Sequence, residues 1–96
     1  MEYIYEDNRI YSLGENELLL AEVTFPKRDE LRVDINHVYV DASLRGRGIA
    51  SDLMLKAYEY IKAKDLKIIA KCPYAISWFK KNEEYQDIVI NVKTRK

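Results

Sequence analysis

Cysteine, glycine and proline are all scarce in this chain. Its single cysteine, Cys72, cannot form an intrachain disulfide. Three glycines and two prolines leave no room for a Pro/Gly-rich linker, and no repeat or low-complexity tract occurs. The 96 residues, 48% of them hydrophobic, are enough for one core and too few for two. We therefore expect a single small domain spanning residues 1–96.

The chain also lacks net charge and long hydrophobic runs. Its 16 basic and 16 acidic residues cancel, so it has no basic field of the kind that drives nucleic-acid binding. Its longest apolar runs, such as residues 18–21, fall far short of the roughly 20 residues that cross a bilayer. Residues 1–6 have neither the basic start nor the apolar core of a signal peptide. These absences predict a cytoplasmic protein that does not bind nucleic acid or membranes.

Spacings that would hold a metal ion are missing as well. The single histidine and single cysteine offer no zinc-binding pattern, and no Asp-rich loop suits calcium. We expect no metal site.

The first forty residues alternate in the manner of β-strands. Strands are expected at 9–13 and 18–25, joined by the polar segment 14–17, which has the length of a hairpin connection. A charged turn at 26–30 then leads to one long strand at 31–40. Its alternation places one set of side chains on a common face: Leu31, Val33, Ile35, His37 and Tyr39.

The apolar period then changes to that of a helix. Residues 48–64 predict an amphipathic helix and residues 66–72 a short strand, an order that makes a right-handed crossover between parallel strands. Pro73 suits a first helical turn, so a second helix is expected over 74–81. Residues 87–92 are predicted to form a last strand, and the basic tail 93–96 to fray.

Two of the three glycines, Gly46 and Gly48, lie between the long strand and the first helix. A missing Cβ permits positive φ and lets backbone N–H groups approach an anion closely. The start of the next helix directs unpaired N–H groups and a positive dipole end toward the same point. The turn is therefore a candidate phosphate site, with an ordinary tight connection as the alternative.

The turn reads Arg-x-x-Gly-x-Ala at Arg45, Gly48 and Ala50, and it resembles the pyrophosphate site of the GCN5-related N-acetyltransferases (GNAT). Residues 38–41, 44–50, 67–75 and 85–87 resemble the very short GNAT-like subfamily. The resemblance implies an α+β or α/β chain with the GNAT-like (acyl-CoA N-acyltransferase) fold. That fold would have a mixed, mostly antiparallel sheet with a splayed parallel strand pair and two helices.

The same resemblance implies acetyl-CoA, or coenzyme A, as the cofactor. Successive turn amides would hold its pyrophosphate, and its pantetheine arm would lie against the preceding strand. The residues to which this cofactor site is assigned are Val38, Tyr39, Val40, Arg45, Gly46, Arg47, Gly48, Ile49 and Ala50.

Three residues are candidates for the chemistry. Cys72 falls at the predicted end of the strand after the crossover helix, where the subfamily places a cysteine. It would either carry the acetyl group as a thiolate or only line the site, and a lone cysteine is also an ordinary small buried residue. His37 is a candidate base for the amine or for Cys72, or a packed strand residue. Tyr74 matches a tyrosine that protonates the leaving thiolate in larger GNAT enzymes, although most of the eight tyrosines must serve packing.

The expected function is acetyl transfer from acetyl-CoA to an unidentified amine by a monomer or weak dimer. The alternative is a non-catalytic CoA-binding module or sensor that acts with a partner. A third possibility is an interaction protein in which the glycine turn is purely structural.

Overall fold

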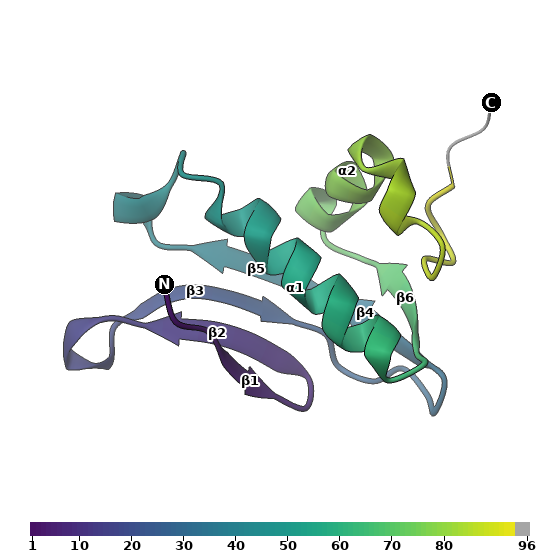
Figure 1. Ribbon diagram of the computed structural model, residues 1–96, viewed down its shortest axis with the longest axis horizontal. Coiled ribbons are helices and arrows are strands. Elements are labelled where there is room, and N and C mark those ends of the chain that lie inside the picture. The colour runs from purple at the N-terminus through teal and green to yellow at the C-terminus, as the bar shows by residue number, and fades with distance from the viewer. Residues whose placement is uncertain (94–96) are drawn as a thin grey trace.

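The computed structural model describes residues 1–93 and places the strands in two sheets (Figure 1). The first sheet is antiparallel, in the order β1-β2-β3-β5, with β1 at Ile4–Glu6, β2 at Arg9–Leu13, β3 at Leu19–Thr24 and β5 at His37–Val40. The second is the parallel pair of β4 at Arg32–Ile35 and β6 at Lys67–Ala70. The helices are α1 at Ile49–Ala63 and α2 at Pro73–Lys81, with 3-10 turns at Glu15–Glu17, Ala42–Leu44 and Glu83–Tyr85.

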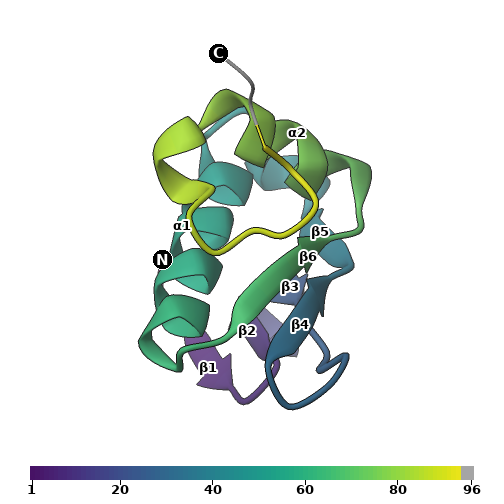
Figure 2. The ribbon, with the colours of Figure 1, turned by 90° about the vertical axis from the view of Figure 1, so that its right-hand side faces the viewer.

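The first hairpin, both helices and the crossover to β6 are confirmed, and β1 is an additional strand that was not predicted. Helix α1 lies across the strands, and α2 follows the end of β6 (Figures 1 and 2). Leu53, Ala57 and Ile61 recur every four residues on α1 and are fully buried against the sheet. On the sheet side the core includes Ile10 and Val23. One face of the antiparallel sheet is therefore covered and the other is open.

The long strand predicted for 31–40 is wrong in one respect, because it breaks at Asn36. Val33 and Ile35 are buried on β4, but on β5 it is Val38 and Val40 that pack on the core, so the inward face shifts by one position. The cause is a change of partner. Asn36 donates its N–H to the Thr24 carbonyl and joins the chain to β3, while β4 pairs with β6. The common face expected for residues 31–39 is thus interrupted, and His37 and Tyr39 point to the open side.

This break produces the splayed pair that was predicted. The Ile35 carbonyl accepts the N–H groups of Lys71 and Cys72, at 2.9 and 3.2 Å, where the parallel pairing ends. Beyond that point β5 continues along β3, whereas the chain after β6 enters α2 (Figure 2). The two strands diverge at the end toward which the turn before α1 also faces.

The last strand predicted for 87–92 is wrong. Within residues 1–93 this segment makes only one isolated parallel bridge to β6, between Ile68 and Val89. Further along, the Asn91 side-chain amide bonds both the N–H and the C=O of Ala70, at 2.9 and 2.7 Å. The Asn91 side chain thus makes the hydrogen bonds to Ala70 that backbone groups would make in a paired strand.

Part of the predicted basic tail, residues 94–96, lies outside the described residues. Lys93, which is described, donates to the Gln86 carbonyl at 3.2 Å. Among the helices that are described, none is long and apolar enough to cross a membrane.

Candidate functional site

The turn between β5 and α1 holds both of its glycines in the left-handed region. Gly46 has φ +83° and Gly48 has φ +76°, as their positions in the sequence predicted. A Cβ built on either glycine would meet no heavy atom within 4 Å. Backbone conformation, rather than crowding by neighbours, is therefore what favours glycine here, and the space in front of both residues is open.

The start of α1 leaves N–H groups available beside these glycines. The first hydrogen bond into the helix runs from the Asp52 N–H to the Gly48 carbonyl, at 3.0 Å. The N–H groups of Ile49, Ala50 and Ser51 precede it, and no backbone acceptor for them occurs in residues 1–93. A concave run of donors at the positive end of a helix can bind an anion.

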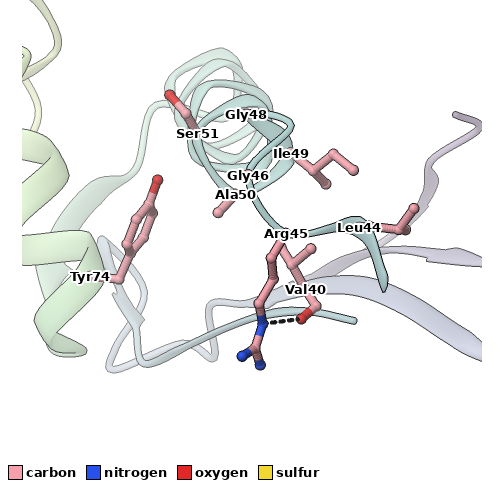
Figure 3. Close-up of a pocket in the computed structure, with 9 residues that line it drawn as sticks. All are labelled: Val40, Leu44, Arg45, Gly46, Gly48, Ile49, Ala50, Ser51 and Tyr74. Atoms are coloured by element: carbon pink, nitrogen blue, oxygen red, sulfur yellow. Dashed lines mark hydrogen bonds between the residues drawn. The ribbon is translucent and has the colours of Figure 1, made fainter. Parts of the chain in front are cut away.

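Polar contacts fix how the chain enters this turn. The Asp41 carboxylate accepts both the N–H and the hydroxyl of Ser43, and these bonds lower the pKa of Asp41 below its usual value. Arg45 donates its Nε to the Val40 carbonyl at 3.2 Å. Figure 3 shows the guanidinium lying along the strand end rather than against the helix. The turn is thus tied to the last residue of β5.

Two shallow cavities open beside the turn. The first, of about 220 Å³, is lined by Val40, Leu44, Arg45, Gly46, Gly48, Ile49, Ala50, Ser51 and Tyr74 (Figure 3). The second, of about 270 Å³, is lined by Val38, Tyr39, Val40, Arg45, Ala50 and Tyr74. Because four residues border both cavities, they form one groove from the start of α1 to the free edge of β5. We call it the turn groove.

The turn groove collects most of the residues assigned to the cofactor from sequence. Arg47 is exposed and lines neither cavity, whereas the other eight line one or both. Leu44 and Ser51 also line the groove and were not predicted. Ser51 could have been recognised, because it is a hydroxyl residue in the first helical turn directly after the Arg-x-x-Gly-x-Ala pattern.

Tyr74 lies across the groove from the start of α1, with its hydroxyl directed toward the helix (Figure 3). It belongs to the first turn of α2 and is 41% exposed. Partial burial raises its pKa above the usual value, and a negative charge on Cys72 adds to the effect. The Tyr74 hydroxyl therefore keeps its proton near neutral pH and is a hydrogen-bond donor.

Cys72 is the N-cap of α2. Its Sγ accepts the N–H of Ala75 at 3.3 Å, and the side chain is partly buried against the core. It lines neither cavity of the turn groove. The structure thus places this sulfur on the helix side of the splayed strands, at the N-terminal end of α2.

His37 lies on the opposite side of the sheet. It pairs in register with Thr24, and its side chain is 51% exposed on the face that carries no helix. Its Nε2 is 3.3 Å from Oε1 of Glu22. His37 and Cys72 both follow the point at Ile35 where the strands diverge, but their side chains leave on different faces and the structure does not bring them together.

No metal site accompanies these residues in the described part of the chain. Residues 1–93 contain no cluster of three or more His, Cys, Asp or Glu side chains that could hold a metal ion.

Comparisons with known proteins agree with the fold. A family profile described as "GCN5-related N-acetyl-transferase" matches residues 9–88. The solution structure of a candidate GCN5-like N-acetyltransferase from Staphylococcus aureus superposes with a TM-score of 0.80 at 29% identity, covering 98% of this chain and 92% of that one. No curated protein matches the sequence significantly.

Larger proteins share the fold over only part of their length. A candidate acetyl transferase from Pyrococcus furiosus has a TM-score of 0.61 and 25% identity, over 92% of this chain and 60% of its own. Tetrahymena GCN5 has a TM-score of 0.62 and 16% identity, over 91% and 61%. The chain therefore spans about three fifths of these proteins. With its profile match over most of the sequence and its splayed GNAT fold, the chain belongs to the GCN5-related N-acetyltransferase family.

Proposed function

We propose that this protein binds acetyl-CoA in the turn groove and transfers the acetyl group to an amine. The observation that carries the proposal is the pair of positive-φ glycines, Gly46 and Gly48, directly before the free N–H groups of α1. They open onto a groove that continues along an unpaired strand edge. An anion at one end and an extended amide-containing arm at the other fit this shape.

The groove residues divide into two parts that suit the cofactor. The backbone N–H groups from Gly46 to Ala50 would hold the pyrophosphate, whereas the Arg45 N–H already bonds the Ala42 carbonyl. The side chains of Arg45 and Arg47 are exposed, so their guanidinium groups can turn toward a phosphate. Residues 38–40 form the edge of the sheet order β1-β2-β3-β5, so their outward backbone groups, apart from the Val40 carbonyl that accepts the Arg45 Nε, are available to the pantetheine amides. The open space in front of both glycines leaves room for the pyrophosphate beside the turn amides.

Acetyl-CoA would supply an activated thioester. In direct transfer, His37 would take one proton from the acceptor ammonium, and the freed nitrogen would form the amide bond as the thioester C–S bond breaks, losing its second proton in that step. Tyr74, whose hydroxyl is still protonated because its pKa is raised, would give its proton to the departing sulfur and take up the second proton of the nitrogen.

In transfer through a covalent carrier, Cys72 as thiolate would accept the acetyl group from the thioester, with CoA leaving as its thiolate, and would then pass the group to the amine and regain its own thiolate. Its place at the N-terminal end of α2 supports this second route, and the exposed position of His37 supports the first.

Two measurements test the proposal. Calorimetric titration with CoA should show binding, and an absence of binding at millimolar CoA contradicts both transfer and the alternative of a CoA-binding module. Incubation with acetyl-CoA and a panel of amines, followed by mass spectrometry, then separates the remaining possibilities.

Acetylated amines in the wild type confirm transfer, and their persistence in Cys72→Ala at the wild-type rate excludes the covalent carrier. Binding of CoA without any acetylated amine or protein favours the non-catalytic module.

A further inference from the structure

Glu22 is a nearly buried carboxylate in the middle of the open sheet face. It belongs to β3, opposite Tyr11 of β2 and Tyr39 of β5 in the strand register. Although no helix covers this face, only 14% of the Glu22 side chain is exposed. Burial of a carboxylate removes part of its hydration, and charged neighbours must compensate for that cost in free energy.

The two oxygens of this carboxylate have different neighbours. Oε2 accepts a short hydrogen bond from Nε of Arg9, whose guanidinium also lies 3.7 Å from the centre of the Tyr11 ring. Oε1 lies 3.3 Å from Nε2 of His37. Arg9 therefore anchors Glu22 from one strand, and the remaining oxygen faces the imidazole on the other side.

His37 lies beside the turn groove, where the orientation of its ring would affect acetyl transfer. It starts β5 immediately after the break at Asn36, and the next residue, Val38, lines the turn groove. An acceptor on the open face and a thioester at the strand edge would meet at this position. A carboxylate only accepts hydrogen bonds, so of the two neutral tautomers of the imidazole it favours the one with its proton on Nε2, which leaves Nδ1 unprotonated.

We propose that Glu22 is a positioning residue for His37, holding the ring so that Nδ1 accepts the proton of the amine. This inference rests on the proposed function in assigning His37 the role of base. Arg9 acts through Glu22, by occupying Oε2 and leaving Oε1 for His37. The open face thereby becomes the side from which the acceptor approaches.

The other groups near this pair supply a matched control. Glu6 lies on β1, 53% exposed, with its carboxylate 3.7 Å from the Arg9 guanidinium. Glu6 lies on the same face as Glu22 and carries the same charge. Its ion pair is with Arg9, whereas His37 pairs with Glu22. Glu6→Gln therefore removes a carboxylate from this face without removing the neighbour of His37.

The test combines a spectroscopic and a kinetic measurement. The ¹⁵N chemical shifts of the His37 ring, recorded on free protein at alkaline pH where imidazole is neutral, report which nitrogen carries the proton. We expect the Nε2–H form in the wild type and in Glu6→Gln, and a mixture of both forms in Glu22→Ala. With acetyl-CoA and spermidine as a model amine, kcat of Glu22→Ala should fall about 10- to 100-fold while CoA affinity stays unchanged.

Glu22→Gln keeps an acceptor oxygen and should restore much of both the Nε2–H form and kcat. Urea denaturation of each variant separates a loss of fold from a loss of positioning. Suppose that the wild type transfers acetyl to spermidine. If Glu22→Ala then keeps either the pure Nε2–H form or full kcat, the inference is overturned and the proposed function stays intact. A wild type that acetylates neither spermidine nor the wider amine panel overturns the proposed function, and the catalytic role given to Glu22 falls with it.

Discussion

The indole nitrogen of Trp78 donates a hydrogen bond to the Ser51 hydroxyl, at 2.7 Å. The bond joins α2 to the first turn of α1, and Ser51 lines the turn groove. Trp78 is 7% exposed and stacked on Tyr85, with ring centres 5.3 Å apart, so the donor is held in place. Since the Ser51 oxygen accepts from the indole, its own proton is left to be donated elsewhere.

This contact predicts that Ser51 and Trp78 are energetically coupled. Trp78→Phe removes the donor and Ser51→Ala removes the acceptor, so each variant should lower the free energy of unfolding. The double variant should lose less than the sum of the two single losses, by about 1 kcal/mol. Urea denaturation of the four proteins measures the coupling, and strict additivity would show that the bond contributes nothing.

We also expect the Ser51→Ala variant to bind CoA more weakly than the wild type. If the Ser51 proton is donated to a cofactor oxygen, its loss should raise the Kd for CoA about fivefold, the equivalent of about 1 kcal/mol. Calorimetry checks this, with Ser77→Ala as a control that changes a serine on α2 outside the lining of the groove. An unchanged Kd for Ser51→Ala would remove Ser51 from the binding site.

Gly48→Ala should destabilise the fold through backbone strain. An L-residue at φ +76° costs about 1 to 2 kcal/mol, and no neighbouring atom adds a clash. Gly48→Asn should cost less, because asparagine tolerates the left-handed region. Thermal denaturation checks the order wild type, Asn, Ala. Gly14→Ala is the comparison, since Gly14 has φ −99° and its added Cβ would meet the Leu20 side chain at 3.1 Å, so that it tests crowding without a left-handed backbone.

A wild-type melting temperature in Gly48→Ala would show that the turn relaxes to another conformation. If it does so, CoA affinity should still fall, because the N–H groups at the start of α1 would no longer face the same point.

The Asp87 carboxylate predicts a pH-dependent part of the stability. It accepts hydrogen bonds from Lys62 at 2.7 Å and from Tyr58 at 2.7 Å, and the first of these is the main reason that its pKa is lowered. A carboxyl group whose pKa is lower in the folded than in the unfolded state stabilises the fold above its unfolded pKa of about 3.9. That contribution is lost as the pH falls through the folded value.

Asp87→Asn should therefore lower the urea midpoint at pH 7, and the difference from wild type should shrink below about pH 4 and vanish when Asp87 is protonated in both states. Asp7→Asn is the control, because Asp7 is 94% exposed and its ion pair with Lys64 spans 4.0 Å. A difference at pH 7 that persists unchanged into acid would assign the effect to packing rather than to the charge of Asp87.

Local patterns in the sequence predicted much of this fold, and the misses are tertiary in origin. Helix α1 and the hairpin of β2 and β3 follow from side-chain periods within each segment. The break at Asn36 does not, because it arises when one strand changes partner from β6 to β3. That change moves His37 to the open face, which is why alternation alone left its side undecided.

The turn groove, like the fold, could be predicted only where it depends on local sequence. Positive φ at Gly46 and Gly48 follows from residue type in a strand-to-helix turn, and both values are confirmed. The hydrogen bond that orients the Ser51 hydroxyl comes from Trp78, 27 positions away along the chain, and no local pattern contains that bond. The turn groove could thus be located from sequence, but the contacts that orient its side chains could not.

The incorrect strand at 87–92 leads to the last prediction. Asn91 accepts the Ala70 N–H through Oδ1 and donates Nδ2 to the Ala70 carbonyl, and Ala70 is 1% exposed. Asn91→Ala would leave both groups of a buried peptide unit without these partners, at a cost of about 1 to 3 kcal/mol. Asn91→Asp keeps the acceptor and loses the donor, and its carboxylate would face the lone pairs of the Ala70 oxygen.

Hydrogen exchange gives the most direct measurement. The Ala70 amide should exchange faster in Asn91→Ala and remain protected in Asn91→Asp, whose oxygen still accepts it, although both variants should unfold at lower urea than wild type. Asn82→Ala is the control, since it removes one side-chain bond to the Trp78 carbonyl, at 2.8 Å, and none at β6. If the Ala70 amide stays protected in Asn91→Ala, backbone groups of residues 88–92 have taken over its pairing, and the segment can form the strand that its apolar residues predicted.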